Sequence, residues 1–134
     1  MLYYLIFCIS LLSGCGASKA ASKDTSGAEK ARYHKISAQE AFTMMSGLNE
    51  YILLDVRTLE EYQEQRIEGA VLIPDNEIQK RAEKELPDRS SAIFVYCRSG
   101  RRSANAARQL VSLGYTKVYD FGGIGGWTYG TVGQ

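Results

Sequence analysis

The sequence predicts a single α/β domain built on a parallel β-sheet. Short apolar runs alternate with segments of helical periodicity, which is the order found in β-α-β units. The runs at 51–56 and 92–96 are nearly continuous in apolar residues, as expected of strands that are covered on both faces. The length of 134 residues fits one domain. The regular alternation indicates strands that run parallel.

Three strands and two helices are expected in the first half of the folded region. The strands are residues 33–36, 51–56 and 70–73. Two capping boxes, in which a hydroxyl residue precedes a glutamate by three positions, mark the helix starts. They are Ser37 with Glu40 and Thr58 with Glu61. The first helix is predicted to stop at Gly47, the second to run through Gln65, and Pro74 closes the third strand.

Two further helices and two further strands are expected in the second half. A helix at 76–86 ends before Pro87, and a strand follows at 92–96. The helix at 103–113 has Gly114 as its stop, and the last strand covers 117–120. The chain therefore contains five predicted strands.

Composition excludes several functional classes. Hydrophobic residues make up 45% and charged residues 23% of the chain, as in ordinary globular proteins. Sixteen Lys and Arg against fifteen Asp and Glu give a net charge of +1, which argues against a nucleic-acid partner. Three Cys and one His are too few for a closed zinc site or a disulfide framework. We expect a monomer without metal or cofactor.

The N-terminus has the features of an export signal. Residues 1–18 carry no charged side chain, and only the first half is strongly apolar, which suits a signal peptide better than a membrane span. The sequence Leu-Ser-Gly-Cys at 12–15 resembles the bacterial lipobox, in which the cysteine is lipidated and becomes the new N-terminus. No Lys or Arg precedes the apolar run, which departs from that pattern. The alternatives are an uncleaved anchor or a buried apolar strand with a chance cysteine.

These features divide the chain into three parts. Residues 1–14 are predicted to be a lipoprotein signal peptide, and residues 15–32 a lipidated Cys15 followed by a flexible tether. The tether is rich in Ala, Ser and Lys and has little apolar surface to bury. Residues 33–134 are the folded domain. This organisation predicts a lipid-anchored, extracytoplasmic protein of the bacterial cell envelope.

The chemistry is concentrated where the strand at 92–96 ends. Cys97 begins a six-residue stretch, 97–102, that holds three arginines and no acid. Positive charge and a nearby helix N-terminus both favour the thiolate form of a cysteine. Gly100 allows a tight turn that aims backbone N–H groups at an anion. The alternative is a small buried cysteine at a strand end, which is common for free cysteines.

Four segments in the correct order resemble a single rhodanese domain, a sulfurtransferase module, over residues 33–127. They are Asp55-Val56-Arg57 with Glu61-Tyr62; Ile67 to Pro74; Cys97 to Ser103; and Leu113-Gly114-Tyr115 with Gly122-Gly123-Ile124 and Trp127. Arg66 stands where the family often has histidine. This departure does not concern the family nucleophile, which is the loop cysteine.

The resemblance implies a central five-stranded parallel sheet with helices on both faces. It also implies that Cys97 attacks the outer sulfur of a small anionic donor such as thiosulfate, and that a thiol or cyanide accepts that sulfur. The expected anion loop comprises Arg98, Ser99, Gly100, Arg101, Arg102 and Ser103. The family match favours Arg102 for direct contact with the donor. Asp55 and Arg57 are expected to be structural, ordering neighbouring loops by charge-assisted hydrogen bonds.

Two other functions compete with the enzyme. The same fold could serve as a non-enzymatic persulfide carrier or a membrane-tethered interaction module. A cysteine-dependent phosphatase or arsenate reductase would need arginine six positions after the cysteine, where this chain has Ser103. The loop is therefore one residue too short for phosphate.

Overall fold

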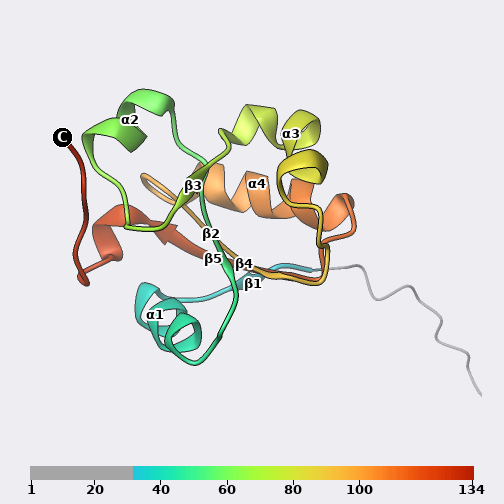
Figure 1. The fold of residues 1–134 in the computed structure, drawn as a ribbon, viewed down its shortest axis with the longest axis horizontal. Coiled ribbons are helices and arrows are strands. Elements are labelled where there is room, and N and C mark those ends of the chain that lie inside the picture. The colour runs from blue at the N-terminus through green and yellow to red at the C-terminus, as the bar shows by residue number, and fades with distance from the viewer. Residues whose placement is uncertain (1–31) are drawn as a thin grey trace, which may run out of the picture.

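The computed structural model describes residues 32–134, which form an α/β domain (Figure 1). The predicted signal peptide, the lipidation at Cys15 and nearly all of the predicted tether lie outside these residues. No helix between residues 32 and 134 has the length and apolar character needed to cross a membrane.

The sheet has five strands, all paired in parallel, in the order β1-β5-β4-β2-β3. The strands are β1 (His34–Lys35), β2 (Ile52–Asp55), β3 (Val71–Leu72), β4 (Ala92–Cys97) and β5 (Lys117–Gly123). The predicted five-stranded parallel sheet is confirmed. Strand β4 lies at its centre, so its carboxyl end opens at the middle of one sheet edge.

Four α-helices connect the strands. They are α1 (Ala38–Ser46), α2 (Leu59–Glu64), α3 (Ile78–Glu85) and α4 (Arg101–Ser112). Single 3₁₀ turns, η1 (Asp75–Glu77) and η2 (Ile124–Gly126), precede α3 and follow β5. Both predicted capping boxes are present, because each hydroxyl accepts the glutamate's backbone N–H and each carboxylate accepts the hydroxyl residue's N–H.

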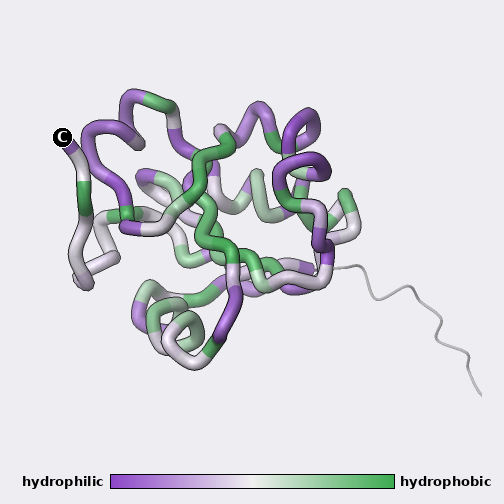
Figure 2. The backbone as a smooth tube through the Cα atoms, viewed as in Figure 1, coloured by the Kyte–Doolittle hydropathy of each residue, from purple (hydrophilic) through white to green (hydrophobic). Residues whose placement is uncertain are grey.

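Helices cover both faces of the sheet, as Figure 1 shows, with α1 on one side and α3 and α4 on the other. The apolar strands occupy the middle of the domain (Figure 2). Along β4, Ile93 and Val95 pack with α3 and α4, whereas Phe94 and Tyr96 pack on the α1 side. Cys97 continues the first set, so its side chain belongs to the face that α4 covers.

Two boundary differences concern the candidate site, while the other element ends shift by no more than two residues. Helix α4 begins at Arg101 and not at Ser103, because Gly100 takes a left-handed conformation with φ +99° and starts the helix directly. Strand β5 continues three residues beyond Asp120, because Gly123 pairs with Cys97 across a register shift in β4. The longer β5 places Gly123 beside Cys97, and the earlier helix start places Arg101 and Arg102 in the first turn of α4.

Candidate active site around Cys97

Cys97 is the last residue of β4, and its side chain is fully buried. Its Sγ accepts the backbone N–H of Gly100 at 2.9 Å and lies 3.5 Å from Oγ of Ser103. The Ser103 hydroxyl donates in turn to the carbonyl oxygen of Gly100, at 3.1 Å. The turn at 98–100 therefore folds back over the sulfur and leads directly into α4.

This geometry suits negative charge on the sulfur. The N–H of Gly100 points at Sγ, and Sγ lies beside the first turn of α4, where the unpaired N–H groups of a helix create positive potential. Of the predicted loop residues, Gly100 and Ser103 contact this sulfur, and Arg101, Arg102 and Ser103 lie in the first turn of α4.

Glycine at position 123 lets β5 approach the loop. Gly123 pairs with Cys97, and a Cβ on it would overlap the carbonyl oxygen of Arg98. In the sequence this glycine belongs to the segment that resembles the family's C-terminal motif. The structure shows that Gly123 lets the backbone of the cysteine loop pack directly against β5.

Replacing Gly123 with alanine should therefore destabilise the domain by about 1–3 kcal/mol, since the added methyl group displaces loop backbone. Urea denaturation measures the free energy of unfolding. Gly125→Ala is the matched control, because no atom lies within 4 Å of the Cβ it would add. Equal stability losses in the two variants would show that the close approach at Gly123 has no energetic consequence.

The three loop arginines have different surroundings. The side chains of Arg98 and Arg101 are exposed, whereas Arg102 is 28% exposed and paired with Glu61. Nη1 and Nη2 of Arg102 donate to the two carboxylate oxygens of Glu61 at 2.7 and 2.8 Å. These hydrogen bonds are the main cause that lowers the pKa of Glu61 to about 2, and they raise the pKa of Arg102.

Asp55, the last residue of β2, and Arg57 form a buried ion pair. Arg57 donates from Nη2 to Oδ2 of Asp55 at 2.7 Å and from Nε to Oδ1 at 2.9 Å, and the pair is 4% and 0% exposed. The Tyr96 hydroxyl donates to the same carboxylate at 2.7 Å, and Arg57 also donates to the carbonyl oxygen of Gln65. Burial, with Asp55 as the next cause, raises the pKa of Tyr96. These charge-assisted hydrogen bonds tie β2, β4 and the end of α2 together.

A polar cavity of about 190 Å³ lies beside the loop. Its lining residues are Arg57, Glu61, Glu64, Gln65, Arg98 and Ile124. Arginine side chains reach it both from the loop and from the buried ion pair. This cavity offers a small anionic or polar molecule a place next to the Cys97 loop.

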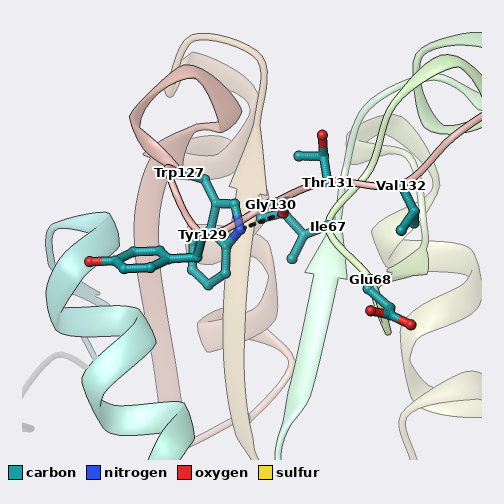
Figure 3. Close-up of a pocket in the computed structure, with 7 residues that line it drawn as sticks. All are labelled: Ile67, Glu68, Trp127, Tyr129, Gly130, Thr131 and Val132. Atoms are coloured by element: carbon teal, nitrogen blue, oxygen red, sulfur yellow. Dashed lines mark hydrogen bonds between the residues drawn. The ribbon is translucent and has the colours of Figure 1, made fainter.

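A second cavity, of about 240 Å³, is drawn in Figure 3. Its walls are Ile67, Glu68, Trp127, Tyr129, Gly130, Thr131 and Val132. The Trp127 indole N–H donates to the carbonyl oxygen of Gly130 at 3.0 Å, and Tyr129 stacks on Phe42 of α1. Trp127 is partly buried against the core on the α1 side. None of these residues is a nucleophilic cysteine or a cation.

Comparison with known proteins shows which family the domain resembles. Residues 37–129 match the family model of the rhodanese-like domain. The chain is 39% identical over 71 residues to the thiosulfate sulfurtransferase PspE of Escherichia coli K12, covering 53% of this chain and 68% of PspE. It is 31% identical over 96 residues to the thiosulfate sulfurtransferase GlpE of Coxiella burnetii, covering 71% of this chain and 87% of GlpE.

Solved structures show the same fold. A structure of a rhodanese with anions from E. coli superimposes with a TM-score of 0.60 at 34% identity, covering 63% of this chain and 100% of the other. A rhodanese-related protein from Thermoplasma volcanium gives a TM-score of 0.64 at 30% identity, covering 75% of this chain and 98% of the other.

Proposed function

This chain belongs to the rhodanese-like domain family, and we propose that it is a sulfurtransferase whose nucleophile is Cys97. The observation that carries the proposal is the position of the Cys97 sulfur, which accepts the Gly100 N–H at 2.9 Å at the start of a helix flanked by arginines. The similarity to two thiosulfate sulfurtransferases supports a small anionic sulfur donor and a thiol acceptor as its substrates.

The proposed reaction has two steps. In the first, the Cys97 thiolate attacks the outer sulfur of thiosulfate, a new S–S bond forms, and the bond to the central sulfur breaks, so that sulfite leaves with the electron pair. In the second, an acceptor thiolate or cyanide attacks the terminal sulfur of the Cys97 persulfide. The Cys97 thiolate leaves with that bond's electron pair, and the acceptor keeps the sulfur as a persulfide or as thiocyanate.

The loop contributes electrostatic stabilisation to both steps. The N–H of Gly100 and the first turn of α4 face the sulfur whose charge changes. The arginines provide positive potential for an anionic donor and for the sulfite that leaves. A cysteine-dependent phosphatase needs arginine at position 103, where this chain has Ser103, whose hydroxyl donates to the Gly100 carbonyl oxygen.

Turnover of thiosulfate with cyanide tests the proposal. We expect thiocyanate and sulfite to form in equal amounts, with many molecules of each product per protein molecule. A Cys97 persulfide that forms once and is not discharged to cyanide or to a small thiol would instead identify the persulfide carrier. Absence of both persulfide and thiocyanate would exclude sulfur transfer.

The proposal extends to the location of the protein. We propose that Cys15 is lipidated and holds the domain at the bacterial envelope, outside the cytoplasm, where it acts as a monomer. The support is the Leu-Ser-Gly-Cys sequence at 12–15 after an uncharged apolar run. A cysteine that carries two or more acyl chains gives stable membrane attachment, whereas one chain gives only marginal attachment.

Cys15→Ser should accordingly move the protein from the membrane fraction to the soluble fraction of the cell. Cys8→Ser, in the same apolar segment, is the matched control and should leave the protein in the membrane fraction. Immunoblots of fractionated cells measure the distribution, and mass spectrometry of the N-terminus identifies the modification. A Cys15→Ser protein that stays in the membrane with an intact N-terminus would establish an uncleaved anchor instead.

A further inference from the structure

The arginines near Cys97 fall into a paired and an unpaired group. Arg57 is paired with Asp55, and Arg102 with Glu61. Arg98 and Arg101 are exposed and form no ion pair with any residue from 32 to 134. Arg98, in the turn at 98–100, and Arg101, directly after it, therefore carry positive charges that no ion pair neutralises.

Glu61 is itself held in place. Its Oε2 accepts the backbone N–H of Thr58 at 3.0 Å, and its own N–H donates to the Thr58 hydroxyl at 3.3 Å. The same carboxylate receives both terminal nitrogens of Arg102. Glu61 thus joins the N-terminus of α2 to the first turn of α4, and its two-point contact fixes the plane of the Arg102 guanidinium.

Pairing decides how much charge the loop can offer an anion. Three arginines less the charge of Glu61 leave a net charge of +2 (3 − 1 = 2), which Arg98 and Arg101 carry. Glu64 also lines the cavity beside Arg98 but makes no ion pair with it. Because the pKa of Glu61 is about 2, the Arg102 pair persists across the neutral pH range. Arg98 and Arg101 therefore stay available to an anionic donor such as thiosulfate.

We propose that Arg98 and Arg101 bind the anionic sulfur donor, and that Glu61 is a positioning residue that withholds Arg102 from it. This inference rests on the proposed sulfur transfer for the identity of the donor. It assigns donor binding to different arginines from the one that the family motif favours, which is Arg102. The edge of the Arg102 guanidinium formed by Nη1 and Nη2 is already occupied by the Glu61 carboxylate.

Steady-state kinetics with thiosulfate test this assignment. Arg98→Ala and Arg101→Ala should each raise KM for thiosulfate about tenfold, whereas Arg102→Gln should raise it less than about threefold. Glu61→Gln should lower KM about two- to threefold, because it releases a third cation to the donor. Arg108→Ala, which removes another exposed charge from α4, is the control and should leave KM unchanged. Circular dichroism verifies that each variant is folded.

A double variant separates positioning from a direct effect of the Glu61 charge. If Glu61 acts through Arg102, Glu61→Gln should have no effect on KM in the Arg102→Gln background. If Glu61→Gln lowers KM equally in both backgrounds, Glu61 acts on the donor directly and is not a positioning residue.

A second readout does not depend on sulfur transfer. The ratio of Cys97 alkylation rates by iodoacetate and by neutral iodoacetamide, measured on the Cys97 peptide by mass spectrometry, reports the positive potential at the sulfur. The ratio should fall in Arg98→Ala and Arg101→Ala and rise in Glu61→Gln. This pattern in a protein that transfers no sulfur would retain the anion site and reject the proposed enzyme. An active wild-type enzyme in which Arg102→Gln gives the largest rise in KM would overturn the assignment and retain the enzyme.

Discussion

Replacing Cys97 with serine should abolish sulfur transfer and leave the domain folded. Serine differs from cysteine by one atom and can accept the Gly100 N–H in the same place, so the turn is expected to close as before. A serine hydroxyl cannot form a persulfide, and therefore the two-step reaction loses its intermediate. We expect kcat/KM for thiosulfate to fall by a factor of about 10³ or more.

Thiocyanate production measures the loss, and far-UV circular dichroism with urea denaturation measures the fold. Cys15→Ser, which removes a cysteine outside the folded domain, is the control and should keep full activity. A Cys97→Ser protein that unfolds would favour the alternative of a buried structural cysteine. Full activity in the folded variant would reject Cys97 as the nucleophile.

The second large effect concerns the buried ion pair. Asp55→Ala should lower the free energy of unfolding by about 3–5 kcal/mol, because it leaves the Arg57 guanidinium buried without its carboxylate. The same substitution removes the acceptor of the Tyr96 hydroxyl. The stability loss should be much larger than for a surface pair, since Asp55 is 0% and Arg57 4% exposed.

Urea denaturation gives the stability difference, and Tyr96→Phe is the matched control. It removes one hydrogen bond to Asp55 but keeps the ion pair, so we expect a loss of about 1–2 kcal/mol. If Asp55→Ala abolished sulfur transfer with the stability of the wild type, Asp55 would belong to the chemistry and not to the scaffold.

The features that could be predicted from sequence depend on neighbours along the chain. Both capping boxes were predicted because a hydroxyl and a glutamate three residues later suffice to close them. The central strand β4 was predicted because burial on both faces requires an unbroken apolar run. The loop cysteine was identified because its arginines are adjacent to it in sequence.

Contacts between distant segments were missed. Glu61 was expected only to cap α2, yet it also holds Arg102, 41 positions further on. Arg66 forms an antiparallel bridge with Val132, by which the C-terminal tail is fastened to the end of α2. Gly133 passes so close to the carbonyl oxygen of Glu64 that a side chain there would overlap it. No local pattern marks such pairs, because only the fold brings them together.

The start of α4 was misplaced for a related reason. The helix was expected to begin at Ser103, after the predicted anion turn. The Ser103 hydroxyl donates to the Gly100 carbonyl oxygen and contacts Sγ of Cys97. Ser103 therefore stabilises the loop from a position inside the first turn of α4. The earlier start places Arg101 and Arg102 in the first turn of α4.

The most direct test of the account is the mass of Cys97 after exposure to thiosulfate. The protein is incubated with thiosulfate, freed of excess donor and digested without reductant, and the Cys97 peptide is weighed. We predict a gain of about 32 Da, the mass of one sulfur atom held as a persulfide, and its loss on addition of cyanide. An unmodified Cys97 peptide from folded protein at saturating thiosulfate would contradict the account.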